Sequence, residues 1–267
     1  LSTWSEFPPG KNDPDLYLLV MRNLALAHGL CYEQVKKWDE TSFSGLGSCT
    51  VGLVPVLQVF APYDPDDPRD VKASRLIDYA FNEWGLNAVF HGDYDMNLDY
   101  LISADEQKPY RVRGCDYLGV NYYSRWKIKY VDNGMKPLAN FKLMPCEGDC
   151  TDYGWEIYPE GLRKVLNFAY NRYRRPIYIT ENGIADEKGD TRTRYLLTHM
   201  TALHKTIHVD KVPILGYYHW TLMDNFEWSD GFKIHFGLFR VDKKTKKRIP
   251  TSTVEIYKKI SENNALP

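Results

Sequence analysis

The sequence has little of what marks several classes of protein. Its net charge is −1 at pH 7, so it lacks the broad positive field that attracts nucleic acid. The longest nearly apolar run, residues 51–61, is too short to cross a bilayer and is interrupted by Pro55 and Gln58. No signal peptide is recognisable. We therefore expect a cytoplasmic protein with no nucleic-acid or membrane partner.

Cysteine is also scarce, with five residues in a chain of 267. An odd number without a regular framework suits a reducing compartment. The closest pair is Cys146 and Cys150, separated by Glu-Gly-Asp. We expect these two to be loop thiols, with a local disulfide or half of a metal site as the alternatives. No metal site is predicted.

Aromatic residues, in contrast, are plentiful at 14% of the chain, including 7 Trp and 20 Tyr. Packing in the core accounts for most of them. Tyr and Trp also combine an apolar face with a hydrogen-bonding edge, which suits the rim of a carbohydrate site.

Hydrophobic periodicity predicts strands that alternate with helices. Helices are expected over residues 15–37, 71–84, 160–173, 192–208 and 252–262. Strands are expected over residues 51–60, 115–124, 176–181 and 212–220, with a long loop over 127–155. This alternation indicates a parallel sheet, either in a β/α barrel or in a doubly wound fold.

Polar residues at the carboxyl ends of the predicted strands favour the barrel. Asn121 to Ser124, Glu181-Asn182 and His219-Trp220 all stand at such ends, and the working face of a β/α barrel is the carboxyl rim of its strands. No Gly-rich phosphate loop follows any of these strands. A barrel needs eight strands, whereas the pattern supports four and a possible short strand at 1–6. The chain therefore resembles the second half of a larger barrel.

The stretch "YITENG", residues 178–183, ends a strand on the carboxylate of Glu181. Tyr123 from the preceding strand and Trp220 from the following one could stand beside it, together with the acidic and aromatic segment 224–232. Carboxylate, phenol, indole and amide groups are poor ligands for metals or phosphate and suit a neutral polyhydroxylated molecule. Hydrolysis of a glycosidic bond requires two carboxyl groups, one on each side of the reacting carbon.

Four motifs in the same order closely resemble glycoside hydrolase family 1, the β-glucosidase/β-galactosidase family. They are "LGVNYYSR" (118–125), "GWEIYPEGL" (154–162), "YITENGIAD" (178–186) and "HWTLMDNFEWSDGFKIHFGLFRVD" (219–242). The resemblance implies a (β/α)8 TIM barrel, of which this chain supplies roughly the C-terminal half, from the end of strand 4 to helix 8. Residues 1–267 would then form a single partial TIM-barrel catalytic domain.

The same resemblance implies catalytic roles for three residues. Glu181 matches the nucleophile, and Tyr123 matches the phenol that hydrogen-bonds it. Glu6 is the nearest match to the acid/base glutamate, but the motif around it departs from the family, with Ser5 and Phe7 where Asn and Pro are usual. Either a loop is lost between Glu6 and Phe7, or Glu6 is not the counterpart of the family's acid/base.

A further group matches the residues that bind the sugar. Asn121 matches an amide that lines the site, and Trp220 matches the platform beneath the ring. Glu227 matches the carboxylate that takes the 4- and 6-hydroxyls, and Trp228 the indole that binds the 3-hydroxyl. Phe236 matches an aromatic residue at the rim.

The resemblance therefore implies a retaining β-glycosidase that hydrolyses β-linked glucosides or galactosides by double displacement, with neither metal nor organic cofactor. Its partner molecules would be β-linked oligosaccharides or aryl and alkyl glycosides. The family's first three strands, which supply a Gln, a His and an Arg to the site, have no counterpart in the sequence. The alternatives are a catalytically impaired fragment or a sugar-binding scaffold that needs a complementary N-terminal half-barrel, or a half-barrel that pairs with a second copy.

Overall fold

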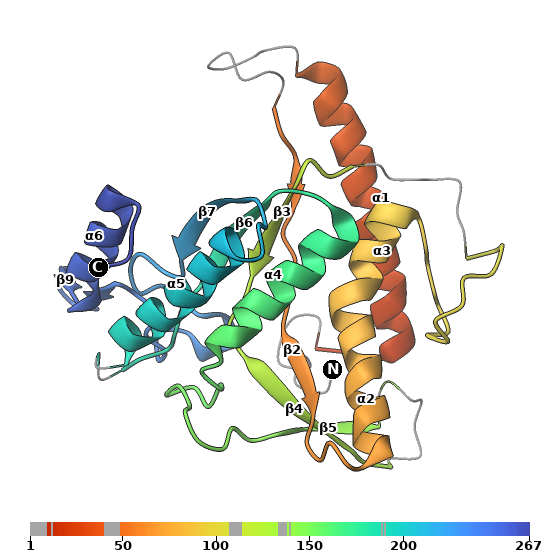
Figure 1. The fold of residues 1–267 in the computed structure, drawn as a ribbon, viewed down its shortest axis with the longest axis horizontal. Coiled ribbons are helices and arrows are strands. Elements are labelled where there is room, and N and C mark those ends of the chain that lie inside the picture. The colour runs from red at the N-terminus through yellow and green to blue at the C-terminus, as the bar shows by residue number, and fades with distance from the viewer. Residues whose placement is uncertain are drawn as a thin grey trace.

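The computed structural model describes residues 10–11, 13–39, 49–106, 114–132, 138, 140–187, 189 and 191–267 (Figure 1). The possible strand at residues 1–6 lies outside this set. Among the described residues, none of the helices combines the length and the apolar composition that a bilayer crossing requires.

The central element is a four-stranded sheet in the order β1-β3-β6-β7, in which every neighbouring pair is parallel. Its strands are β1 (Gly52–Leu53), β3 (Tyr117–Asn121), β6 (Ile177–Asn182) and β7 (Ile214–His219). The order in the sheet follows the order in the chain, and helices connect β3 to β6 and β6 to β7. This succession is the one that a β/α barrel repeats around its axis.

Helices cover the sheet, and some of them begin at a proline, which suits the first position of a helix. They are α1 (Pro14–Trp38), α2 (Pro68–Asp78), α3 (Trp84–His91), α4 (Pro159–Tyr173), α5 (Arg192–His208) and α6 (Thr253–Asn263), with a π-helical turn, η3, at Tyr79–Glu83 and a 3-10 turn, η5, at Trp228–Asp230. Asp13 caps α1 by accepting hydrogen bonds from the amides of Asp15 and Leu16. The predicted helix over 192–208 is confirmed to the residue.

Two expectations about strands are wrong. The predicted buried strand over 51–60 is divided into β1 and β2 (Val59–Pro62), because β2 leaves the main sheet and pairs with β4 (Arg125–Tyr130). The predicted long loop over 127–155 contains part of β4 and all of β5 (Phe141–Met144), which form an antiparallel pair. A second small sheet joins β8 (Phe239–Val241) to β9 (Arg248–Pro250).

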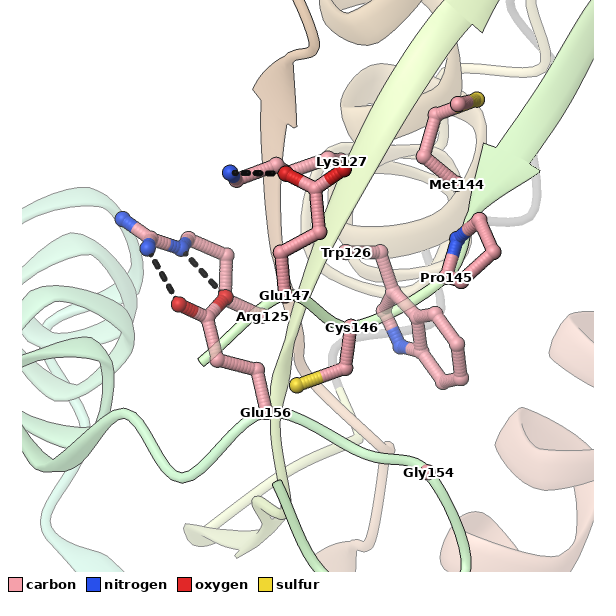
Figure 2. A pocket seen from close by; sticks show the side chains of 9 residues that line it. All are labelled: Arg125, Trp126, Lys127, Met144, Pro145, Cys146, Glu147, Gly154 and Glu156. Carbon is pink, nitrogen blue, oxygen red and sulfur yellow. Dashed lines mark hydrogen bonds and ion pairs between the residues drawn. The ribbon is translucent and has the colours of Figure 1, made fainter. Parts of the chain in front are cut away.

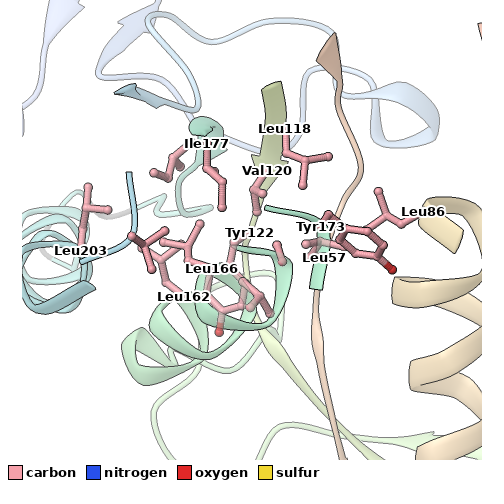
Figure 3. Packing of buried hydrophobic residues seen from close by; sticks show 14 of the residues in the cluster. Leu57, Leu86, Leu118, Val120, Tyr122, Leu162, Leu166, Tyr173, Ile177 and Leu203 are labelled. Carbon is pink, nitrogen blue, oxygen red and sulfur yellow. The ribbon is translucent and has the colours of Figure 1, made fainter. Parts of the chain in front are cut away.

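The main core lies between the sheet and the helices α4 and α5, as Figures 1 and 3 show. Strand residues at alternating positions point into it, since side chains two apart on a strand share a face. Leu118 and Val120 of β3 and Ile177 and Ile179 of β6 are fully buried there. Their helical partners include Leu162, Leu166, Leu196 and Leu203. This packing fixes the strands whose carboxyl ends carry the candidate site.

The pair Cys146 and Cys150 forms a disulfide, so the expectation of loop thiols is wrong. The chain turns tightly after β5 and brings the two Cα atoms to 6.1 Å, within the range that a disulfide spans. Cys31, Cys49 and Cys115 are free.

Candidate active site

A bulge in β6 decides the direction in which Glu181 points. Val120 is paired with Ile179, but the next residue of β3, Asn121, is paired with Glu181, so β6 carries one extra residue. Simple alternation would place Glu181 on the core face with Ile177 and Ile179. The extra residue places it opposite Asn121 instead, on the other face of the sheet. Bulges commonly re-aim side chains next to functional sites.

The hydroxyl of Tyr123 donates a hydrogen bond of 2.6 Å to Oε2 of Glu181. Tyr123 is buried, and Glu181 is partly exposed. Burial raises the pKa of Tyr123, and the nearby charge of Glu181 raises it further, so the phenol stays protonated and remains a donor. The predicted contact between these two residues is present in the structure.

A buried amide anchors the backbone directly after the carboxylate. Nδ2 of Asn182 donates to the carbonyl oxygen of Tyr122 at 2.8 Å and lies 2.9 Å from the hydroxyl of Tyr195. Its Oδ1 accepts a bond of 2.9 Å from the hydroxyl of Tyr217. Because these residues come from β6, β7, α5 and the end of β3, the network ties the tip of β6 to three neighbouring elements.

Trp220 and Glu227 form a second polar group near Glu181. The indole of Trp220 favours the charged form of the Glu227 carboxylate. Partial burial nevertheless raises the pKa of Glu227, and the charge of Glu181 adds to this effect. Asn121 is buried at the same edge and accepts a hydrogen bond of 2.6 Å from Thr180.

The remaining predicted ligand residues take different positions. Trp228 is 67% exposed on the loop after β7, where an indole could meet a solute. Phe236, expected at the rim, is 3% exposed and packs beneath the site, with its ring centroid 6.3 Å from that of Tyr123. The predicted acid/base candidate, Glu6, lies outside the described residues.

Sequence reasoning missed two residues that shape this region. Asp224 accepts hydrogen bonds from the amide of Gly237 at 3.0 Å and pairs with the ring of His235 at 2.8 Å, which holds the base of the loop that carries Glu227. Trp155 packs its ring edge-on against Tyr123 at 5.5 Å. Only its place in the motif at 154–162 could have drawn attention to Trp155.

Glu181 has no cationic partner in the described part of the chain. Within it, no Lys, Arg or His forms an ion pair with Glu181, and no group of three or more His, Cys, Asp or Glu side chains is arranged to hold a metal. A carboxylate held by a phenol at a strand tip, beside an indole and a second carboxylate, is suited to attack on a polyol ligand.

Parallel strands in chain order with functional side chains at their carboxyl ends are the arrangement of β/α-barrel enzymes. The family model for Glycosyl hydrolase family 1 matches residues 3–266, and the chain belongs to this family. The predicted family and the predicted partial TIM barrel are thereby confirmed.

Individual relatives agree with this assignment. The chain is 34% identical to a β-galactosidase of Pyrococcus woesei, covering 100% of this chain and 55% of that protein. A β-glycosidase structure from Pyrococcus horikoshii matches with a TM-score of 0.84 at 30% identity, over 98% of this chain and 57% of that one. A Thermotoga maritima β-glucosidase in complex with glucoimidazole matches with a TM-score of 0.84 at 28% identity, over 99% and 60%. The chain thus spans little more than half the length of these relatives.

Proposed function

We propose that this chain forms the nucleophile-bearing half of a retaining β-glycosidase that hydrolyses β-linked glucosides or galactosides. The observation that carries the proposal is the hydrogen bond from Tyr123 to Glu181 at the tip of β6. It holds one carboxylate oxygen and leaves the other free to act. Membership of glycosyl hydrolase family 1 supports the same chemistry.

The reaction proceeds by two displacements. Glu181 attacks the anomeric carbon and forms a glycosyl ester, while an acid protonates the departing oxygen. The acid/base group, now ionised, then takes a proton from a water molecule as that water attacks the same carbon and releases Glu181. We assign Glu6 to that second role. The mechanism requires neither a metal nor an organic cofactor.

The sugar is held by groups on the same rim. The indole face of Trp220 suits the apolar face of a hexose, and the neighbouring Glu227 presents a carboxylate to the 4- and 6-hydroxyls. Asn121 and Trp228 offer further polar contacts. Phe236 acts through packing, because it lies buried behind Tyr123. Suitable substrates are β-linked oligosaccharides and aryl or alkyl glycosides.

The site is completed by the other half of the barrel, on this polypeptide or on another. In the described sheet, β1 and β7 are the two end strands, each paired on one side only. Leu215 and Tyr218 of β7 are 52% and 57% exposed, and Val54 beside β1 is 48% exposed. Apolar side chains at unpaired strand edges favour pairing with further strands. Residues 1–267 would then be one part of a single catalytic domain. The competing arrangement is a pair of half-barrels formed by two copies of this chain.

A cytoplasmic location stays a prediction from the sequence. The Cys146–Cys150 disulfide favours a more oxidising compartment. Fractionation of the source cells, followed by detection of the protein, decides between these locations.

The decisive experiment is Glu181→Gln in the protein with a complete barrel, assayed on an aryl β-glucoside. We expect turnover to fall by about 10³-fold or more, because no ester can form on an amide. The matched control is Glu187→Gln, which alters an exposed carboxylate on the following loop and leaves turnover unchanged within about twofold.

Covalent labelling makes the assignment independent of turnover. A 2-fluoro glucoside with a good leaving group should add one glycosyl unit to the peptide that contains Glu181. If the unsubstituted protein binds the sugar but no label forms, the chain belongs to a sugar-binding scaffold instead. Full turnover in Glu181→Gln would show that another group is the nucleophile.

A further inference from the structure

The Cys146–Cys150 disulfide lies directly after β5 and has no part in the mechanism above. Its two cysteines are four positions apart in the sequence, so the bond closes a small ring of chain. Figure 2 shows Cys146 beside Trp126, with the ion pair of Arg125 and Glu156 nearby. The ring therefore borders the strand pair β4–β5 on one side and the segment leading to α4 on the other.

Asp149, inside this ring, attaches it to the rest of the barrel. Its carboxylate accepts hydrogen bonds from both terminal nitrogens of Arg194 on α5, at 2.5 and 2.7 Å. Its carbonyl oxygen accepts a bond of 2.9 Å from the amide of Ile157. Closure of the ring limits the conformations of Asp149 and so favours both contacts.

The chain after the ring folds back on itself as a tight hairpin. Cys150 forms an antiparallel bridge with Glu156. The amide of Thr151 donates to the carbonyl oxygen of Trp155 at 2.8 Å, and the amide of Trp155 donates to Oγ1 of Thr151 at 3.1 Å. The disulfide fixes Cys150 on one arm of the hairpin and, through these bonds, restrains the other arm, which carries Trp155.

Trp155 transmits this constraint to the site. Its ring centroid lies 5.5 Å from that of Tyr123 and 6.1 Å from that of Phe236, in edge-on and tilted contacts. Tyr123 in turn donates to Glu181 at 2.6 Å. A continuous set of contacts thus leads from the disulfide through the hairpin and two aromatic rings to the carboxylate.

We propose that the Cys146–Cys150 disulfide is a redox-sensitive positioning device that holds Trp155 against Tyr123 and so sets the geometry of Glu181. A dithiol reductant breaks the S–S bond. The two cysteines each gain one electron and one proton, and the reductant's two thiols become a disulfide. The hairpin then opens more often, and Tyr123 holds Glu181 less firmly. The effect of the disulfide on Trp155 and Tyr123 does not depend on the proposed function. Its effect on catalysis through Glu181 rests on that function.

Hydrogen exchange measured by mass spectrometry tests the structural part without any substrate. In the full chain, dithiothreitol should speed exchange in the peptide covering 150–157 by about tenfold, with a smaller increase at 122–124. The double variant Cys146→Ser/Cys150→Ser should exchange at the fast rate with or without reductant. The control Cys31→Ser/Cys49→Ser changes two exposed free thiols and should respond as the unsubstituted protein does.

The outcomes separate the two levels of the proposal. Exchange that changes less than twofold on reduction, with mass spectrometry confirming that Cys146 and Cys150 are both reduced, overturns the positioning role. If exchange responds, the enzyme with a complete barrel is assayed on an aryl β-glucoside. A fall of about three- to tenfold in kcat with little change in KM supports action through Glu181. A raised KM with unchanged kcat overturns the link to Glu181, and so do unchanged kinetics. An enzyme that is inactive in both redox states contradicts the proposed function instead.

Discussion

Gly183 lies against the carbonyl oxygen of Trp220, so closely that a Cβ at position 183 would stand 1.8 Å from that oxygen. The two residues follow the ends of neighbouring strands β6 and β7, and the amide of Trp220 donates to the carbonyl oxygen of Asn182 at 3.0 Å. The glycine after the Glu181-Asn182 pair is therefore required by the close approach of one backbone to another.

Gly183→Ala should destabilise the protein by about 3 kcal/mol, because two backbones must separate to admit the methyl group. Chemical denaturation followed by circular dichroism measures the change. The control is Gly85→Ala in α3, where the nearest atom to the added Cβ is the flexible end of Met21 at 3.1 Å. There we expect a change within about 1 kcal/mol. Similar stability of the two variants would contradict the account of Gly183.

Tyr123→Phe should lower kcat on an aryl β-glucoside by about 10- to 100-fold in the enzyme with a complete barrel. The substitution removes a charge-assisted hydrogen bond to Glu181 and keeps the ring that packs on Trp155. Tyr32→Phe is the control. The hydroxyl of Tyr32 also donates to a carboxylate, since it lies 2.9 Å from Oδ1 of Asp116. A twofold or smaller effect at Tyr123 would show that its hydroxyl does not serve the nucleophile.

Trp220→Phe should raise the pKa of Glu227 above its already raised value. The substitution removes the indole donor that favours the ionised carboxylate, while burial and the charge of Glu181 continue to disfavour it. Carbon-13 NMR of labelled glutamate side chains, followed over a pH titration, measures this directly. Trp126→Phe removes an indole elsewhere and should leave the Glu227 titration in place. An unchanged or lower pKa would mean that Trp220 does not support the charge.

We expect the free energy of unfolding to fall in mild acid, because His199 is buried in its neutral form. Complete burial lowers the pKa of His199 from 6.5 to about 4, so the unfolded chain binds a proton at a higher pH than the folded protein does. The contribution of neutral, buried His199 to the free energy of unfolding is fully present above pH 6.5. It is lost as the pH falls towards 4, at about 1.4 kcal/mol per pH unit.

Denaturation of His199→Gln at several pH values tests this expectation. The variant should lose less stability than the unsubstituted protein between pH 6.5 and 4. His204→Gln, on an exposed part of the same helix, should follow the unsubstituted protein. Parallel pH profiles for His199→Gln and the unsubstituted protein would exclude His199 as the source.

Local patterns predicted much of the architecture because they depend on neighbours in the chain. The helix over 192–208 was predictable from the three- and four-residue spacing of Leu196, Met200 and Leu203. β5 was not, because its four residues, Phe141–Met144, are too few to show a clear period and are stabilised by pairing with β4. The disulfide was equally hidden, since its formation depends on how the chain turns after β5.

The sequence by itself determined the family, the alternation of strands with helices, and the residues at the strand tips, because motif and periodicity are properties of the chain. Only the tertiary structure decided how Glu181 turns away from the core to accept the hydrogen bond of Tyr123 at 2.6 Å. That direction follows from the bulge opposite Asn121 and from the buried bonds of Asn182. Register between strands is set by packing and hydrogen bonds across residues distant in sequence, which no local pattern records.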